Sequence, residues 1–369
     1  PALLEEAVQL AADSDVAVIF AGLPDSFESE GYDRQHMRMP DCQNELINEI
    51  CKVQENVIVV LHNGSPVEMP WNDKVSAVLE VYLCGEATGE ATADILFGKA
   101  NPCGKLAETI PMKLSDTPCY LTFPGDRHAE YNEGVFVGYR YYDKKEMAVR
   151  YPFGHGLSYT TFEYSDIKLS DTTVGDDDIL TVNAVITNTG NCVGKEIVQL
   201  YVADKSGFAV RPEKELKDFI KIELQPGERK TVTFRLDKRA FSYYNEALGD
   251  WYAPNGKYDI MIASSSRDIR LTAEVTHKTA VKLPFVATEN TVFGEFMDYA
   301  EGKATIDLLF SKVAKGLLGG DHFEPEAVRS MIGSMPLRQI RSFGGISDEL
   351  LQQAVDMLNK DFGGFKAQM

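Results

Sequence analysis

The sequence predicts a multi-domain protein with an α/β sandwich around a mostly parallel sheet, an all-β sandwich and a helical C-terminal tail. Two changes of pattern along the chain predict this order. Short apolar runs alternate with helical spacing up to about residue 125, and two-residue periodicity takes over from about 162 to 280. Helical spacing returns from 284 to 369. A length of 369 residues, at roughly 150 residues per domain, agrees with two or three domains.

The first domain is expected over residues 1–125. Its apolar run at 15–21 is too short for a core helix and too continuous for a half-exposed strand, so we expect a parallel strand buried on both faces. Asp41 follows Pro40 and is expected to be the N-cap of a helix. Strands that alternate with helices imply a parallel sheet with helices on both faces. The expected strands are 15–21, 57–61 and 75–83, and the expected helices are 2–12, one that begins at Asp41, and 86–97.

An all-β domain is expected over 162–280, after a connector at 126–161. The connector holds aromatics and glycines in irregular order, and we expect it to be covered by its neighbours. Turn sequences such as Asn255-Gly256 separate the short strands of the all-β domain. Strands at this spacing without helices are typical of an antiparallel sandwich of the immunoglobulin or fibronectin type III kind. We expect strands at 179–187, 196–203, 217–224, 230–236 and 257–263.

Residues 284–369 form the expected helical tail. Ser347 is expected to cap a helix whose first turn carries Asp348 and Glu349, where carboxylates suit the helix dipole. An apolar stripe predicts another helix, and we expect the methionines to fill the core rather than to form a cofactor site. The stripe is Ile306, Phe310, Val313 and Leu317, and the methionines are Met297, Met331, Met335 and Met357.

The charge balance excludes some classes of partner. The chain carries 37 Lys and Arg against 56 Asp and Glu, a net charge of −19. So acidic a surface repels phosphate, which argues against nucleic acid and anionic membranes as partners. The sequence also lacks an apolar run of about 18 residues, the length that a membrane span needs. A neutral polar ligand such as a sugar remains compatible.

The cysteines and the glycine-rich segments indicate no metal and no organic cofactor. The six cysteines form no C-x-x-C pair, and we expect buried free thiols, which slightly favours a reducing compartment such as the cytoplasm. The compartment stays open, because the chain opens with Pro1 and is expected to be part of something longer. Dinucleotide and P-loop fingerprints are absent. The acidic turn Asp176-Asp177-Asp178 is expected to be solvated rather than to bind calcium.

Ligands of open α/β sheets bind outside the carboxyl ends of the strands, and three loops leave those ends here. They are 22–34, 62–71 and 84–90. The first loop interleaves carboxylates with aromatics, which suits sugars because flat rings face sugar C–H groups while carboxylates bond hydroxyls. The alternative is a solvated surface loop. Its carboxylates and aromatics are Asp25, Phe27, Glu28, Glu30, Tyr32 and Asp33.

Four segments in this order resemble glycoside hydrolase family 3, and in particular its bacterial and fungal β-glucosidases. They are Ser29–Arg34 (SEGYDR), Asn63–Val67 (NGSPV), Gly134–Tyr142 (GVFVGYRYY) and Phe153–Tyr159 (FGHGLSY). Two later segments, 211–219 and 224–228, resemble the fibronectin type III-like last domain of that family. The tail resembles a helical extension of some members.

The resemblance implies a retaining β-glucosidase that hydrolyses terminal β-D-glucosides or short oligosaccharides. Members carry an Asp nucleophile on a (β/α)8 barrel and take the general acid/base Glu from the α/β domain. Glu30 matches that Glu, and Glu28 is the runner-up. Phe27 and Tyr32 are expected to contact substrate, and the alternative for Phe27 is ordinary packing within the loop. A general acid needs a raised pKa, and an apolar, partly enclosed setting raises the pKa of a carboxyl. Flanking aromatic rings and a covering neighbouring domain could provide that setting for Glu30.

Other residues near these motifs are expected to be structural. Asp33 and Arg34 are expected to form a pair that shapes the loop. Trp71 and the Tyr139–Tyr142 cluster are expected to pack in the interior.

The barrel itself is missing from the sequence. Nothing in it has the eight βα units of a barrel, which takes about 250 residues. A retaining glycosidase needs two carboxyls about 5–5.5 Å apart, so we expect this chain alone to be inactive. The face left by the absent barrel is expected to be apolar and to favour a homo-oligomer. The alternative function is a non-catalytic sugar-binding or scaffold module.

Overall fold

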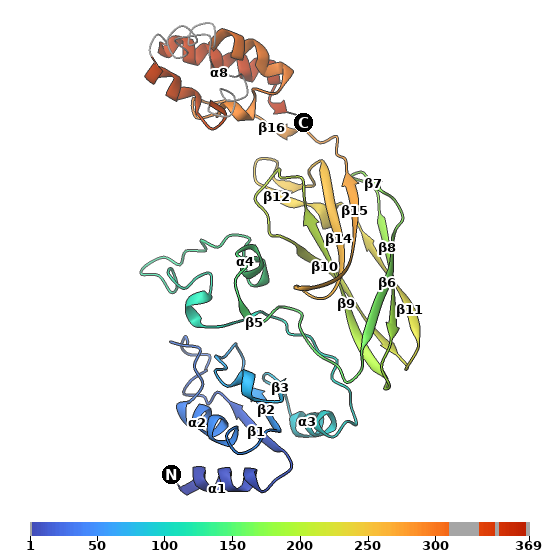
Figure 1. Cartoon of the computed structure of the whole chain (residues 1–369). Helices are drawn as coiled ribbons and strands as arrows, with labels where there is room; N and C mark the ends of the chain where they lie inside the picture. Colours follow the sequence, from blue (N-terminus) through green and yellow to red (C-terminus); the bar gives the residue numbers. More distant parts are fainter. Residues whose placement is uncertain (1, 310–331, 344–346, 367–369) are drawn as a thin grey trace, which may run out of the picture. The chain divides into compact units, whose positions relative to one another are not determined.

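The computed structural model describes residues 2–309, 332–343 and 347–366. The chain divides into two compact units, which are described separately (Figure 1). The first unit comprises Pro1–Thr172, Ile179–Leu236 and Lys257–Val275, and the second comprises Thr173–Asp178, Asp237–Gly256 and Thr276–Met369.

The first unit begins with the expected parallel sheet. Its strands lie in the order β1-β2-β3, and both pairings are parallel. Helices α1 and α2 contact each other, and α2 contacts β1, so one face of the sheet is covered. The core beneath them includes Ile19, Ile47, Val59 and Trp71. The elements are α1 (Ala2–Ala12), β1 (Ala17–Gly22), α2 (Asp41–Ile50), β2 (Val57–His62), η1 (Asn72–Lys74), β3 (Ala77–Glu80) and α3 (Thr88–Leu96).

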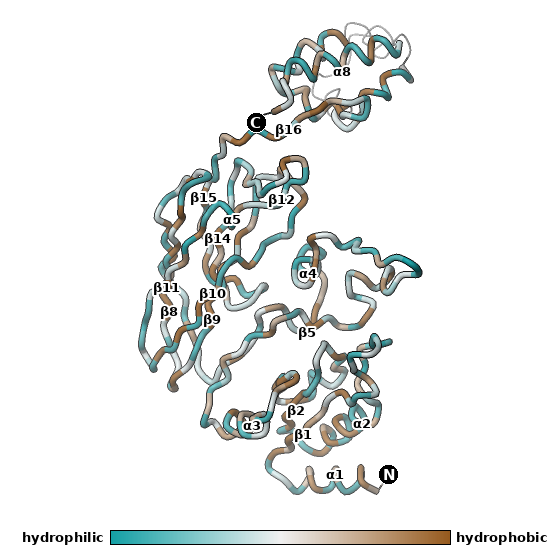
Figure 2. Tube along the Cα trace, turned by 180° about the vertical axis from the view of Figure 1, so that it is seen from behind, coloured by the Kyte–Doolittle hydropathy of each residue, from teal (hydrophilic) through white to brown (hydrophobic). Residues whose placement is uncertain are grey.

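Strand β1 corrects one expectation, because it is buried on one face only. Ala17, Ile19 and Ala21 point into the core, whereas Val18 is 39% and Phe20 61% exposed. Hydrophobic residues run continuously along β1 and β2 (Figure 2), so the sequence pattern does not separate the two strands. The outer face of β1 is exposed because no described element covers it.

The start of α2 differs from expectation as well. Pro40, not Asp41, occupies the N-cap position, and no side chain caps the helix. Proline fits there because its φ is fixed near the value observed, −50°. Asp41 instead lies in the first turn, where its carboxylate suits the helix dipole.

The connector is covered only in its second half. Residues from 126 to 132 are all exposed, and Tyr131 is 83% exposed, which corrects the expectation of a covered connector. The backbone carbonyl of Tyr131 accepts a hydrogen bond from the N–H of Gly134, which is a contact within a turn. Helix α4 then brings Tyr142 into the interior. The elements from 110 to 151 are β4 (Ile110–Pro111), η2 (Leu114–Asp116), α4 (Tyr139–Lys144) and β5 (Val149–Tyr151), with β4 paired to β5.

The all-β sandwich is present, and the five expected strands lie within it. One sheet has the order β11-β8-β6, and the other contains β10-β9-β14-β15. Alternate residues of β8, from Leu180 to Ile186, are fully buried, as two packed sheets require. The expected strands missed β6 and β15. The strands are β6 (Phe162–Leu169), β8 (Leu180–Asn188), β9 (Gly194–Asp204), β10 (Glu215–Leu224), β11 (Arg229–Leu236), β14 (Gly256–Ser265) and β15 (Asp268–His277).

The second unit holds one edge of the sandwich region and the helical tail. In it, β7 (Thr173–Val174) pairs with the last two residues of β15. Asp176 accepts a hydrogen bond from Thr279 (2.6 Å) and lies 3.3 Å from Lys238, so this acidic residue is engaged within the unit. Also here are α5 (Lys238–Phe241) and the hairpin of β12 (Tyr243–Asn245) with β13 (Asp250–Tyr252).

The tail has its own hydrophobic core, which includes Phe296, Leu309 and Leu358. The predicted cap is confirmed, because the side chain of Ser347 accepts a hydrogen bond from the backbone N–H of Leu350. Met297 and Met335 pack against this core. Phe310, Val313, Leu317 and Met331 lie outside the described residues. The remaining elements are β16 (Leu283–Pro284), η3 (Phe293–Glu295), η4 (Ala300–Gly302), η5 (Leu337–Phe343), α8 (Asp348–Phe362) and β17 (Phe365–Lys366).

All six cysteines are free, as expected, but none is buried. Within the described ranges, no helix is long and apolar enough to cross a membrane.

Candidate active site

The loop that carries the predicted site residues leaves the carboxyl end of β1 and begins from a fixed point. The side-chain amide of Gln43 in α2 bonds both main-chain groups of Gly22, accepting from its N–H at 2.9 Å and donating to its carbonyl at 3.0 Å. A Cβ at Gly22 would lie 2.1 Å from the carbonyl oxygen of His62, so only glycine fits between the strand ends. No pattern in the sequence indicates this contribution of Gln43.

Glu30 lies at the tip of this loop. Ser29 and Tyr32 form an isolated antiparallel bridge, which leaves Glu30 and Gly31 as the two residues of the turn between them. The side chain of Glu30 is exposed, and it makes no hydrogen bond or ion pair with any residue that the structure describes. Its carboxylate is therefore available to an external group.

Glu28 has the opposite environment. One carboxylate oxygen accepts a 2.7 Å hydrogen bond from the backbone N–H of Gly64, and the other accepts a 2.5 Å bond from the hydroxyl of Ser65. Both oxygens of the runner-up residue are thus engaged with the loop that follows β2. These contacts favour Glu30 over Glu28 as the group that meets substrate.

The two predicted substrate-binding aromatics flank the turn in different ways. The ring of Phe27 meets the ring of His36 edge-on, with centroids 5.7 Å apart. Tyr32 is 48% exposed, and its hydroxyl donates to the backbone carbonyl of Asp25 within the loop. Both side chains thus contact other residues of the loop or its flank, and Tyr32 remains about half exposed to solvent.

Arg34 shapes the loop, but not as a pair with Asp33. Its Nη1 donates to the hydroxyl of Ser65 at 2.8 Å and to the carbonyl of Pro66 at 3.0 Å. No contact between the side chains of Asp33 and Arg34 is found, and Asp33 is exposed. The half-buried guanidinium thus binds the loop after β2 rather than its neighbour Asp33.

A half-buried carboxyl behind this loop was not singled out from the sequence. Glu80, at the end of β3, accepts hydrogen bonds from the backbone N–H of Tyr82 (2.9 Å) and from the amide of Asn63 (3.3 Å). Burial raises the pKa of Glu80 to about 7, with smaller contributions from Glu108 and Glu28 in the same direction. Burial also raises the pKa of Glu108.

The residues that we expected to pack do pack. Trp71 is fully buried, and its indole N–H donates to Asn44 at 2.9 Å. The ring of Tyr139 stacks on Phe153 with centroids 4.7 Å apart. Tyr142 is 4% exposed. The aromatic cluster of α4 is therefore interior packing.

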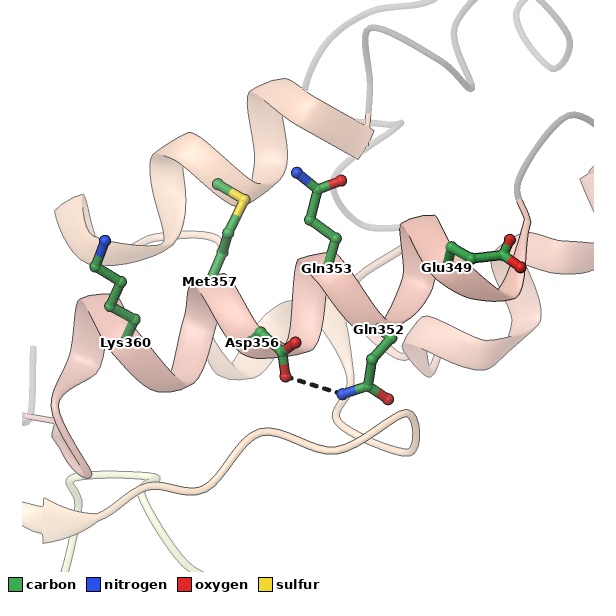
Figure 3. Close-up of a pocket in the computed structure, with 6 residues that line it drawn as sticks. All are labelled: Glu349, Gln352, Gln353, Asp356, Met357 and Lys360. Carbon is green, nitrogen blue, oxygen red and sulfur yellow. Dashed lines mark hydrogen bonds between the residues drawn. The ribbon is translucent and has the colours of Figure 1, made fainter.

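Elsewhere, the described residues offer less chemistry. Among the described residues, no group of three or more His, Cys, Asp or Glu side chains is placed to hold a metal ion. An open depression lies on α8 in the second unit, and all its lining side chains come from that one helix (Figure 3). It contains a hydrogen bond from Gln352 to Asp356 (2.9 Å), but no catalytic arrangement. The lining residues are Glu349, Gln352, Gln353, Asp356, Met357 and Lys360.

Two family models match the chain. Residues 1–159 match the glycosyl hydrolase family 3 C-terminal domain, and residues 196–266 match a fibronectin type III-like domain. The first match includes the Glu30 loop, the Asn63–Pro66 loop and α4.

Two similar proteins match over much of the chain. The chain is 50% identical over 360 residues to thermostable β-glucosidase B of Acetivibrio thermocellus. That match covers 97% of this chain and 48% of the relative. The chain is 44% identical over 298 residues to exo-α-(1→6)-L-arabinopyranosidase of Bifidobacterium breve, covering 80% of this chain and 39% of that protein. The chain thus spans about half the length, or less, of these relatives.

Solved structures of β-glucosidases are similar to this chain as well. A family 3 β-glucosidase of Bifidobacterium adolescentis has a TM-score of 0.75 at 42% identity, and the match covers 83% of this chain and 45% of that one. A β-glucosidase of Kluyveromyces marxianus in complex with glucose has a TM-score of 0.71 at 41% identity, covering 74% of this chain and 33% of that one.

Proposed function

Since the chain belongs to glycoside hydrolase family 3, with the C-terminal domain of that family followed by a fibronectin type III-like domain, we propose that it supplies the general acid/base of a retaining β-glucosidase. Glu30 is that acid/base. The nucleophile is an Asp on a (β/α)8 barrel outside this sequence.

The observation that carries the proposal is the contrast between Glu30 and its surroundings. The loop is held at its start, middle and end, at Gly22, Glu28 and Arg34. Only the turn at its tip projects, with a free carboxylate. A general acid needs a defined position and an unoccupied carboxyl, and Glu30 combines the two.

The chemistry follows from these properties. In the first step the carboxyl of Glu30 donates its proton to the glycosidic oxygen as the bond to the sugar breaks and the nucleophile bonds the anomeric carbon. In the second step the carboxylate takes a proton from water, which displaces the nucleophile and releases the sugar with retained configuration. Phe27 and Tyr32, beside the turn, contact the sugar or its leaving group.

The need for an external nucleophile is supported by the fold. The described α/β part has three parallel strands and no barrel. The relatives are about twice as long as the matched segment. A barrel that covers the Glu30 turn would also exclude water from its carboxyl. We therefore expect the chain by itself to be inactive.

The substrate is a terminal β-D-glucoside or a short β-linked oligosaccharide. This rests on the β-glucosidase relatives. A second candidate, a terminal α-L-arabinopyranoside, is supported by the relatives from Bifidobacterium, which match at 44% and 45% identity. Hydrolysis of both glycosides in parallel by the complete enzyme distinguishes the candidates.

The acid role is tested by the variant Glu30→Gln in the enzyme that joins this sequence to its barrel. A dinitrophenyl glucoside has a leaving group that needs no proton, whereas cellobiose needs one. We expect glycosylation, followed as kcat/KM, to fall on the order of 10²–10⁴-fold for cellobiose and far less for the aryl glucoside.

The matched control is Glu55→Gln, which removes an exposed carboxylate elsewhere in the α/β part and leaves both rates unchanged. Equal losses on both substrates for Glu30→Gln would refute the acid role. Sugar binding without any turnover in the wild-type complete protein would instead support a non-catalytic module.

A further inference from the structure

The loop after β2 is bonded to the Glu30 loop through two side chains, Glu28 and Arg34. Both carboxylate oxygens of Glu28 accept hydrogen bonds from it, one from Gly64 and one from Ser65. The Ser65 hydroxyl that donates to Glu28 also accepts from Arg34 at 2.8 Å. Ser65 therefore links the middle of the Glu30 loop to its end.

Gly64 makes room for this contact. A Cβ at Gly64 would lie 3.2 Å from both the carboxyl carbon and an oxygen of Glu28, and 3.0 Å from the side chain of Leu83. A side chain at Gly64 would thus press on the carboxylate that its N–H binds. The position of the Glu28 carboxylate depends on the absence of a side chain there.

The loop that accepts Glu28 is itself held from the sheet. The amide of Asn63, which is 1% exposed, donates to the carbonyl of Ser65 at 3.0 Å and to Glu80 at 3.3 Å. The contact surface for Glu28 is therefore built on the ends of β2 and β3. A group bonded to it is fixed relative to the sheet.

We propose that Glu28 is a positioning residue, which fixes the turn that presents Glu30. This proposal rests on the proposed function. Glu30 is two residues beyond Glu28, a span of at most about 7 Å, and the Ser29–Tyr32 bridge closes the turn directly after it. A reacting group misplaced by about 1 Å loses on the order of 10²-fold in rate, so the contacts of Glu28 set the rate although its carboxylate stays away from the substrate.

The first test is amide hydrogen exchange on the 369-residue chain, which needs no catalysis. We expect faster exchange in residues 23–34 for Glu28→Ala and for Gly64→Ala, with the exchange of α1 and α2 unchanged. Asp25→Asn is the matched control, because it removes an exposed carboxylate of the same loop. Unchanged exchange in both Glu28→Ala and Gly64→Ala would overturn the proposal.

The second test measures kinetics in the complete enzyme. We expect Glu28→Ala to lower kcat on the order of 10²-fold with KM little changed, and Glu28→Gln to recover part of the loss because its amide oxygen still accepts from Gly64. The basic limb of the pH profile, which reports the acid, stays in Glu28→Ala and disappears in Glu30→Gln. Wild-type kcat in Glu28→Ala would overturn the positioning role and leave that of Glu30 intact. Loss of the basic limb in Glu28→Ala alone would instead refute Glu30 as the acid.

Discussion

At the residue scale, three glutamates near the ends of β1–β3 differ in what surrounds them. Glu30 is exposed at the tip of a turn, and Glu28 is bonded through both oxygens to Gly64 and Ser65. Glu80 is half-buried and bonded to Asn63 and Tyr82. The same side chain is thus free in one position, held by two hydrogen bonds in the second and half-buried in the third, because the local backbone differs.

Glu80 makes the stability of the α/β part depend on pH. Its folded-state pKa of about 7 lies above its ordinary value of 4.5, so the folded chain binds this proton more tightly than the unfolded chain. Stability is therefore highest below pH 4.5 for this group and falls as the pH rises through 7. The shift corresponds to at most about 3 kcal/mol. Glu108 acts in the same direction.

We expect Glu80→Gln to flatten this dependence, since the amide keeps an acceptor for Tyr82 and carries no charge. Urea unfolding at pH 5 and pH 8 measures it, with fluorescence of Trp71 recorded in a Trp251→Phe background. A variant that loses as much stability as the wild type between these pH values would show that Glu80 titrates normally.

At the scale of elements, α4 is joined to the sandwich by a buried ionic contact within the first unit. Asp143, whose side chain is 6% exposed, lies 2.7 Å from Arg267 of the β14–β15 turn and 3.1 Å from Lys214, just before β10. The hydroxyl of Tyr139 accepts from the backbone N–H of Leu216 at 2.8 Å. The motifs around 138–143 and 211–217 are therefore two sides of one contact.

We expect Asp143→Ala to lower the free energy of unfolding by about 3 kcal/mol, because it leaves two cations without their buried partner. Glu213→Ala is the matched control, since its ion pair with Lys144 is nearly half exposed on both sides and contributes less than about 1 kcal/mol. Chemical denaturation of both variants gives the comparison, and equal losses would show that burial does not strengthen the Asp143 contact.

The elements were more predictable than the contacts between them. Apolar runs and turn residues were enough for β1, β2 and five strands of the sandwich, because these patterns are local. The partners of Gly22, Glu28 and Arg34 lie 21 to 37 residues away along the chain, in helix α2 or on the loop after β2. No periodicity encodes such pairings, so the Glu30 loop was predictable from the sequence, whereas the prediction of Asp33 as the partner of Arg34 was wrong.

At the scale of the whole molecule, apolar surface and acidic charge have opposite effects on self-association. The net charge is −19, which opposes association. The outer edge of β1 has no partner strand in the described ranges, and its outer face exposes Val18 and Phe20. Unpaired apolar edges favour pairing with other chains.

We expect the purified 369-residue chain to self-associate with increasing concentration, and more so at high salt, which screens the charge. Phe20→Lys should shift it toward monomer, whereas Val210→Lys, at an 81% exposed site in the sandwich domain, should not. Sedimentation velocity measures this. A wild-type chain that is monomeric at all concentrations and salt levels would contradict the expectation.

The central claim is that Glu30 is the acid/base of a retaining glycosidase. The most direct measurement is the product that Glu30→Gln forms from an activated aryl glucoside in the presence of azide, in the complete enzyme. Azide attacks the covalent intermediate without needing a general base, so we predict restored turnover and a β-glucosyl azide of retained configuration. No azide product and no rate recovery, with wild-type-like hydrolysis, would contradict the claim.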